Sequence, residues 1–259
     1  GKVHDYLAMK FDYAEKGKVK IDMIDCVEDM LDQFPKKLQT NEVAATPAGD
    51  NLFAKGHGKK LNPERADVFH TTVAKGLFVS KRARPDIQPT IAGLCTRVKE
   101  PDESDWSKLV RLMKHLNGAR KRVLTLSADN LRIIKWCVDV AFAVHPDFKS
   151  HAGATMTFGE GGVINISRKQ KLNTKSSTDS ELVGADDASA MIPWTKLFME
   201  HQGFNIEKNI LFQDNKSAIL LEINGRKSAG KRSRALNVRY FFLTDQVERG
   251  NLSIVYCPT

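Results

Sequence analysis

Asp139 is an acidic residue in a segment that is otherwise largely apolar. It lies between Val138 and Val140 in residues 131–144, LRIIKWCVDVAFAV, a run that predicts a β-strand. Strand interiors disfavour aspartate, and a buried carboxylate without a partner is costly, so a bound cation would explain this residue. Two alternatives stay open: Asp139 faces solvent, or it pairs with a lysine or an arginine.

Two further acids lie where strands and helices are expected to begin or end. Asp214 closes the predicted strand 210–214 and precedes a predicted helix, a position where α/β sheets often carry binding residues. It could instead be the N-cap of that helix. Glu181 lies near the start of another predicted helix, where Thr178 and Glu181 also fit a capping box. Neither acid is conclusive alone.

The three acids together indicate metal chemistry. Asp139, Glu181 and Asp214 come from a strand interior, a first helical turn and a strand end, so a folded sheet could bring them together. Converging carboxylates repel one another unless cations lie between them, and oxygen ligands suit Mg²⁺ or Mn²⁺. Two such ions about 3.5–4 Å apart can activate water and stabilise the leaving oxygen of a phosphodiester. The pattern therefore predicts metal-dependent phosphodiester hydrolysis.

The C-terminal half alternates between strand and helix patterns. Three strands are expected first, and the Gly-rich turn FGEGG between the second and the third predicts antiparallel pairing. A helical region interrupted at Pro193 follows, then a strand, two helices separated by a basic segment, and a last strand. The ranges are 131–144, 151–158 and 161–168 for the first strands, 178–201 for the helical region, 210–214 and 216–223 for the next strand and helix, and 252–257 for the last strand. This order predicts an α/β fold with helices packed on an open mixed sheet.

The N-terminal half reads as a hairpin followed by helices. Alternation through HDYLAMKFDY and a turn at AEKGK predict two strands, and apolar residues at helical spacing follow. The expected ranges are 1–20 for the hairpin, 22–34 for the first helix, 36–62 for a linker, and 64–80 and 104–117 for two further helices. Gly118 is expected to end the last of these helices in a left-handed conformation.

The composition excludes several classes of protein. The 259 residues are 41% hydrophobic and 27% charged, which argues against a disordered or fibrous chain. No apolar run approaches the roughly 20 residues that span a bilayer, and the N-terminus GKVHDYLAMK lacks a signal-peptide core. Four widely spaced cysteines predict neither a zinc site nor disulfides. We therefore expect an intracellular protein, cytoplasmic or nuclear, with no membrane partner.

The formal net charge of +9 favours a polyanionic partner. Two basic clusters are candidates for contacts with nucleic-acid phosphates, although solvated surface loops would look the same. One cluster leads into the helix of Glu181 and the other enters the last predicted helix: Arg168, Lys169, Lys171 and Lys175, then Arg226, Lys227, Lys231, Arg232, Arg234 and Arg239. His145 and His151 follow the Asp139 strand and could assist proton transfer, but we expect ordinary surface histidines.

Six segments occur in a fixed order along the chain: KVHDYLAMKFDY, KIDMIDCVEDMLDQFP, LFVSKRARPDI, KSSTDSELVGA, QDNKSAI and RALNVRYFF. Together they resemble the 3′ part of copia-type retrotransposon polyproteins, and the resemblance covers essentially the whole chain. It implies a remnant of the reverse transcriptase thumb region at 1–50, a helical connection region at 51–127 and an RNase H-like domain at 128–259.

The resemblance also implies which residues would carry activity. It places the family's first RNase H acid at Asp139, its helix glutamate at Glu181 and its third acid at Asp214. The paired-aspartate YVDD-type motif of the polymerase has no counterpart, so no polymerase activity is expected. The family's fourth RNase H acid lies in an ADxxTK-like segment after the last strand. Because the sequence stops at Thr259, we expect three of the four metal-binding acids.

The function implied by the resemblance is that of an RNase H-type endonuclease region of such a polyprotein. It would hydrolyse the RNA strand of RNA–DNA hybrids with Mg²⁺ or Mn²⁺, and its partners would be the hybrid and the rest of the polyprotein. The expected fold class is α/β, an RNase H-like mixed sheet preceded by a small hairpin-plus-helix and a helical connection region. Two alternatives stay open: a catalytically silent nucleic-acid-binding remnant, and a protein–protein scaffold with no nucleic-acid role.

Overall fold

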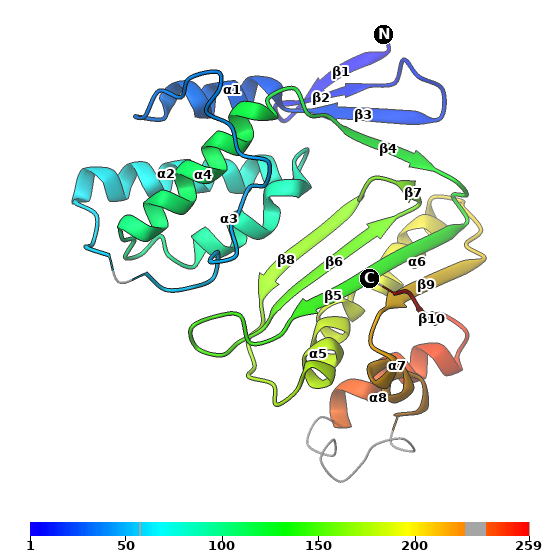
Figure 1. Cartoon of the computed structure of the whole chain (residues 1–259). Coiled ribbons are helices and arrows are strands. Elements are labelled where there is room, and N and C mark those ends of the chain that lie inside the picture. The colour runs from blue at the N-terminus through cyan, green and yellow to red at the C-terminus, as the bar shows by residue number, and fades with distance from the viewer. Residues whose placement is uncertain (57, 226–236, 259) are drawn as a thin grey trace. The chain divides into compact units, whose positions relative to one another are not determined.

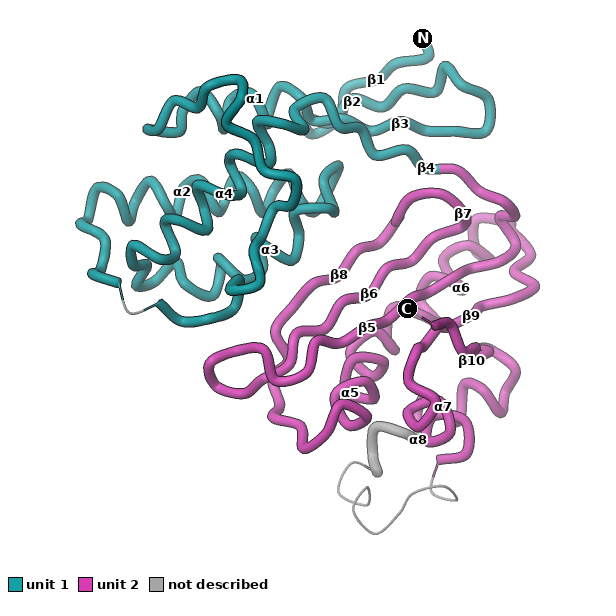
Figure 2. Tube along the Cα trace, viewed as in Figure 1, with its two compact units in different colours: residues 1–126 teal, residues 127–259 magenta. Residues whose placement is uncertain are grey.

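The computed structural model describes residues 1–56, 58–225 and 237–258. The chain divides after Leu126 into two compact units, which Figure 2 shows in different colours. We refer to Gly1–Leu126 as unit 1 and to Ser127–Thr259 as unit 2. In the described ranges, no helix combines the length and the apolarity that crossing a bilayer requires.

Unit 1 consists of a small sheet followed by helices. Its elements are β1 (Val3–Tyr6), β2 (Met9–Asp12), β3 (Lys18–Asp22), α1 (Ile24–Gln33), α2 (Pro63–Ser80), the short 3₁₀ helix η1 (Pro85–Ile87), α3 (Gln88–Cys95) and α4 (Glu103–Gly118), and β4 (Leu124–Ala128) leads into unit 2. The predicted helices of this half are confirmed, and α3 and η1 are additional. Buried side chains from α1, α2, α3 and α4 form one apolar core.

The N-terminal strands differ from the prediction. Where one strand was expected through HDYLAMKFDY, β1 and β2 form an antiparallel pair closed by Leu7 and Ala8. Both turn residues have positive φ, 49° and 62°, so the chain reverses there. Such two-residue turns usually contain glycine, asparagine or aspartate, and this one has none, so the sequence carries no turn signal.

Gly118 does not adopt the predicted left-handed conformation. It is the last residue of α4, it is absent from the positive-φ glycines, and the helix is capped by Ala119 at φ −125°. A Cβ at Gly118 would lie 3.1 Å from side-chain atoms of Val43. The glycine is therefore needed for the close approach of the segment that carries Val43, rather than for a cap.

Unit 2 is a mixed sheet with helices. Its elements after β4 are β5 (Ile133–Ala141), β6 (His151–Thr157), β7 (Gly159–Glu160), β8 (Ile164–Lys169), α5 (Ser177–Ser189), α6 (Met191–His201), β9 (Lys208–Gln213), α7 (Lys216–Asn224), α8 (Asn237–Glu248) and β10 (Ser253–Tyr256). The sheet order is β10-β9-β5-β6-β8 (Figure 1). β5, β6 and β8 are antiparallel neighbours, whereas β9 is parallel to β5 and β10 is parallel to β9. The predicted α/β fold, a mixed sheet with helices packed on it, is confirmed.

The helices of unit 2 bury one set of sheet side chains. α5 packs against β5 and β6, and α8 packs against both α5 and α7. Ile134, Trp136 and Val138 from β5 are buried in the core of this unit. Pro193 does not interrupt the helical region as predicted, because the break between α5 and α6 falls at Ala190. Pro193 lies in the first turn of α6, where the missing N–H has no helical partner to lose.

Candidate metal centre

Asp139 lies in the middle of β5, opposite Gly153 of β6. Burial alternates along this strand, so that Val138 and Val140 are buried and Asp139 between them is exposed. Among the described residues no lysine or arginine forms an ion pair with Asp139. Of the two alternatives left open by the sequence, pairing with a cationic side chain is therefore not found, and the carboxylate faces solvent.

Glu181 lies in the second turn of α5 and does not form the predicted capping box. The N-cap of α5 is Ser176, whose hydroxyl accepts a hydrogen bond from the backbone N–H of Asp179 at 3.1 Å. The helix thus starts two residues earlier than a cap at Thr178 would require. Glu181 is only 5% exposed. Its carboxylate is free of any capping role and is buried instead.

Gly184 allows α5 to lie close to β5. A Cβ at this position would collide with the Cγ2 atom of Val140 and would lie 3.4 Å from Cγ1 of Val138. Any larger residue would push the helix away from the strand. Because Glu181 is one turn before Gly184 on the same helix, this close approach also brings Glu181 toward the middle of β5.

Asp214 directly follows β9 and is not the N-cap of α7. That position belongs to Asn215, whose side-chain oxygen accepts from the backbone N–H groups of Ser217 at 3.0 Å and Ala218 at 3.1 Å. The backbone N–H of Asp214 donates to Oε1 of Gln213 at 3.1 Å. The Asp214 side chain, which is half-buried, is therefore available for another partner.

The structure brings the three predicted acids together. One carboxylate oxygen from each of Asp139, Glu181 and Asp214 lies within 4.8 Å of the other two. Two oxygens bound to the same Mg²⁺ at about 2.1 Å are at most about 4.2 Å apart, so small side-chain adjustments would allow a shared ion. The residues come from β5, α5 and the end of β9, as the sequence reasoning required.

The electrostatics of this cluster fit a site for hard cations. Burial raises the pKa of Glu181, the negative charges of Asp139 and Asp214 raise it further, and the result is a pKa of about 8. Oε2 of Glu181 is buried and has no hydrogen-bond partner among the described residues. Three clustered carboxylates with an orphaned oxygen form the kind of donor set that Mg²⁺ or Mn²⁺ prefers.

Two residues of the first predicted basic cluster already contact other groups of the protein. Arg168 donates to the backbone carbonyl of Asp187 at 2.6 Å, and Nζ of Lys169 lies 2.8 Å from a carboxylate oxygen of Asp147. Lys171 and Lys175 are exposed, and neither forms an ion pair within the described part of the chain. In the second cluster Arg239 belongs to α8, whereas five residues lie outside the described ranges: Arg226, Lys227, Lys231, Arg232 and Arg234.

Glu222 is a buried acid that sequence reasoning missed. It lies in α7 with 0% exposure, and its carboxylate faces the Gln213 side chain but forms no ion pair in the described ranges. Burial raises its pKa to about 7, and its charge also contributes to raising the pKa of Glu181. The signal was present in the sequence, because Glu222 is four residues after Ala218 and adjoins Leu221, both buried.

His145 and His151 are not the surface residues that the sequence predicted. Both are buried, with 4% and 7% exposure. Nε2 of His145 lies 3.1 Å from Nδ1 of His151, and Nε2 of His151 lies 2.8 Å from the Ser167 hydroxyl. Burial lowers the pKa of both rings, that of His151 to about 4. The pair joins the end of the loop after β5 to β6 and β8.

The sequence is similar to retrotransposon polyproteins. The retrovirus-related Pol polyproteins from transposons RE2 and RE1 of Arabidopsis thaliana are each 25% identical to this chain over 178 residues. The match covers 68% of this chain, which spans 12% of the length of each relative. No family model matches the chain.

Solved structures that align with this chain include a viral protein and two RNase H1 proteins. A foamy viral protease-reverse transcriptase, solved in complex with an RNA/DNA hybrid, aligns with 100% of this chain and 29% of its own, at 10% identity and a TM-score of 0.50. LC11-RNase H1 from compost and RNase H1 from Halobacterium salinarum align with 49% of this chain and 86% of their own, at 14% and 15% identity and TM-scores of 0.37 and 0.34. The chain is therefore similar in sequence to transposon-encoded Pol polyproteins, and its fold resembles that of part of the foamy viral protease-reverse transcriptase.

Proposed function

We propose that unit 2 hydrolyses the RNA strand of RNA–DNA hybrids, with Asp139, Glu181 and Asp214 as ligands of divalent cations. The observation that carries this proposal is the convergence of three carboxylate oxygens within 4.8 Å, from elements far apart in the sequence. A structural acid cluster would be expected to include lysine or arginine partners, and this cluster has none among the described residues.

Each acid has a role that follows from its surroundings. Asp139 is exposed and is the ligand that a substrate phosphate can approach, so it would hold an ion on the substrate side. Glu181 is buried and would hold an ion from the helix side, whereas Asp214 would hold it from the end of β9. Bound ions would lower the pKa of water and stabilise charge on the leaving oxygen. Mg²⁺ is the proposed ion, and Mn²⁺ would bind the same oxygen ligands.

The proposed substrate rests on charge and on similarity. Lys171 and Lys175 are exposed cations that lead into α5, and they could contact phosphates without reading sequence. The structural relative that aligns with the whole chain was solved with an RNA/DNA hybrid. By the same similarity, residues 1–50 are proposed to be a thumb remnant and 51–127 a connection region of a copia-type polyprotein, which would make the rest of the polyprotein a partner.

The proposal is tested by cleavage of a labelled RNA–DNA hybrid. We expect Mg²⁺-dependent cleavage of the RNA strand by the full chain, and the Asp139→Asn variant should lower the rate by about 100-fold or more. That factor corresponds to the loss of a few kcal/mol of charge stabilisation in the transition state. The matched control is Asp179→Asn, which removes the same charge from the first turn of α5 but not from the acid cluster.

Three outcomes of this assay are informative. Loss of cleavage in Asp139→Asn with normal cleavage in Asp179→Asn would support the proposal. Equal activity of Asp139→Asn and the unmodified chain would refute it. Salt-sensitive hybrid binding with no product at any Mg²⁺ or Mn²⁺ concentration would instead support the alternative of a catalytically silent nucleic-acid-binding remnant.

A further inference from the structure

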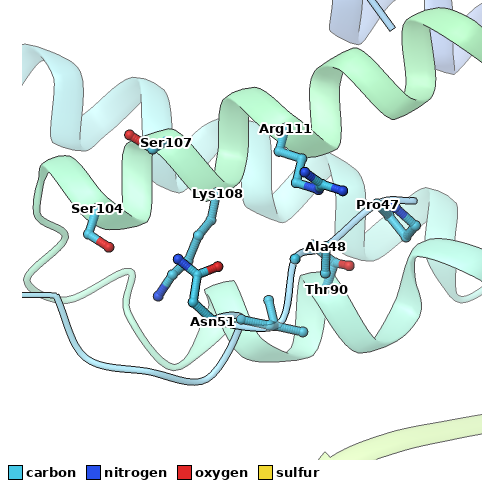
Figure 3. Close-up of a pocket in the computed structure, with 10 residues that line it drawn as sticks. Pro47, Ala48, Asn51, Thr90, Ser104, Ser107, Lys108 and Arg111 are labelled. Atoms are coloured by element: carbon cyan, nitrogen blue, oxygen red, sulfur yellow. The ribbon is translucent and has the colours of Figure 1, made fainter. Parts of the chain in front are cut away.

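Unit 1 contains a cavity of about 330 Å³ that plays no part in the proposed nuclease site. Its walls are one face of α4, part of α3 and the segment that includes Pro47 and Asn51 (Figure 3). The volume is at the lower end of the range of small-ligand pockets, roughly 300–1,000 Å³. The cavity is therefore large enough for a small ligand or for one group of a larger ligand.

Two cationic side chains from α4 enter this cavity. Lys108 and Arg111 are three residues apart, so they lie on the same face of the helix, and in Figure 3 both extend toward the segment that covers it. Lys108 is only 8% exposed. The Arg111 guanidinium donates to the Thr46 hydroxyl at 2.9 Å, and in the described part of the chain no acidic side chain pairs with it.

The excess positive charge of the cavity comes from Arg111. Nζ of Lys108 donates to the Ala54 carbonyl at 2.6 Å and lies 3.7 Å from Oδ1 of Asp105. Arg97 lies 3.0 Å from the other oxygen of Asp105 and 3.8 Å from an oxygen of Asp102. Two buried carboxylates thus face two cations, while Arg111 has no acidic partner among the described residues. The three cations and two acids leave the cavity with one positive charge in excess.

Neutral hydrogen-bonding groups complete the lining. Thr90 of α3 is 1% exposed, and its hydroxyl has no hydrogen-bond partner within residues 1–56, 58–225 and 237–258. Ser104 of α4 and Asn51 of the covering segment also line the cavity. A buried hydroxyl without a partner is costly, and a ligand oxygen could satisfy it. Cations, hydroxyls and an amide around one small cavity suit an oxyanion.

We propose that this cavity binds a phosphate group, with Arg111 and Lys108 as its cationic ligands and Thr90 as a hydroxyl donor. The planar guanidinium can form two parallel hydrogen bonds to phosphate oxygens, and such charge-assisted bonds are among the strongest in proteins. The phosphate comes from a nucleic-acid strand or from a free phosphorylated molecule. The chemistry of recognition is the same in both cases, and the proposal is independent of nuclease activity.

The test is calorimetric titration of the full chain with inorganic phosphate and with pyrophosphate at low ionic strength. Arg111→Gln should weaken binding of both by about tenfold or more, the effect of one charge-assisted hydrogen bond. The matched control is Lys121→Gln, which removes one positive charge from an exposed residue of unit 1 outside the cavity and should leave both affinities within about twofold. No heat of binding in the unmodified chain, or equal affinity in Arg111→Gln, would overturn the proposal.

A second variant guards against loss of folding. Thr90→Val preserves shape and removes a hydroxyl that has no partner, so the fold should tolerate it. It should weaken phosphate binding by about three- to tenfold, and unchanged affinity would remove Thr90 from the proposed site. Competition then identifies the source of the phosphate. Displacement of a fluorescent RNA–DNA hybrid by phosphate would indicate a nucleic-acid strand, and phosphate binding that leaves the hybrid bound would indicate a free phosphorylated molecule.

Discussion

A half-buried acid of unit 1, Asp86, and a buried acid of unit 2, Glu181, have opposite surroundings. In unit 1, Asp86 accepts hydrogen bonds from Arg84 at 2.9 and 2.8 Å and from Arg122 at 3.0 Å, and a ring nitrogen of His115 lies 3.3 Å away. In unit 2, Glu181 has two other carboxylates as neighbours, and one of its oxygens has no hydrogen-bond partner in the part of the chain that the structure describes. The first acid is surrounded by donors, and the second is surrounded by like charges.

The pKa values express this difference. Burial alone would raise the pKa of Asp86, but His115, Arg84 and Arg122 outweigh it and hold the pKa well below its usual range. Burial also raises the pKa of Glu181, and Asp139 and Asp214 add to the effect, so that it reaches about 8. Unit 1 thus supplies its own cations, whereas unit 2 leaves an acid cluster that an external cation would stabilise.

Substitution of Arg84 in unit 1 should have the largest effect on stability. Arg84 is 1% exposed and also donates to the Ala119 carbonyl, so Arg84→Met removes the main partner of Asp86. We expect unit 1 to lose about 3–5 kcal/mol of stability, measured by hydrogen exchange of α4 amides in urea. The control is Lys60→Met, in an ion pair whose side chains are 72% and 67% exposed, which should cost under about 1 kcal/mol. Equal effects would contradict the account of Asp86.

Substitution of Glu181 should have the opposite sign. Its folded-state pKa is raised from 4.5 to about 8, so stability present below about pH 4.5 is lost as the pH rises toward 8. Glu181→Gln should therefore stabilise the metal-free protein at pH 8 by roughly 3 kcal/mol, less than the full shift implies because Asp139 is exposed to solvent screening. Urea unfolding in EDTA from pH 4 to 8 measures this gain. A gain independent of pH would contradict the prediction.

Glu222 is a second buried acid of unit 2; it forms no ion pair among the described residues and lies outside the acid cluster. Its folded-state pKa is about 7, so its stability cost should develop between about pH 4.5 and 7. Glu222→Gln should recover roughly 2 kcal/mol at pH 7. Added Mg²⁺ should leave the gain from Glu222→Gln unchanged and should abolish the gain from Glu181→Gln. The same Mg²⁺ response in both variants would show that the two acids belong to one site.

The sequence identified the three acids of the candidate site but did not exclude that two of them cap helices. The signals were an acid inside an apolar strand, Asp139, and acids at the ends of elements, Glu181 and Asp214. Whether Glu181 and Asp214 are metal ligands or parts of helix caps depends on the residue at which each helix begins. Local sequence does not fix that residue, because Ser176 and Asn215 are as good N-caps as Thr178 and Asp214. A shift of one or two residues along the chain decides between these roles, and local propensity does not resolve it.

Elements with a strong pattern of apolar residues were predicted best, and features that depend on tertiary contacts were predicted worst. The strands and helices of unit 2 follow the patterns of apolar residues. The reversal at Leu7 and Ala8 has no glycine, asparagine or aspartate to mark it, and only the pairing of β1 with β2 selects it. Burial of Glu222 likewise depends on α8, which packs against α7 from a distant part of the chain.

The most direct test of the acid cluster is anomalous scattering from crystals of the full chain soaked in Mn²⁺. The account predicts at least one peak about 2 Å from oxygens of Asp139, Glu181 and Asp214, and no such peak in crystals of Asp139→Asn. Mn²⁺ bound elsewhere, with these three carboxylates still without an ion, would contradict it.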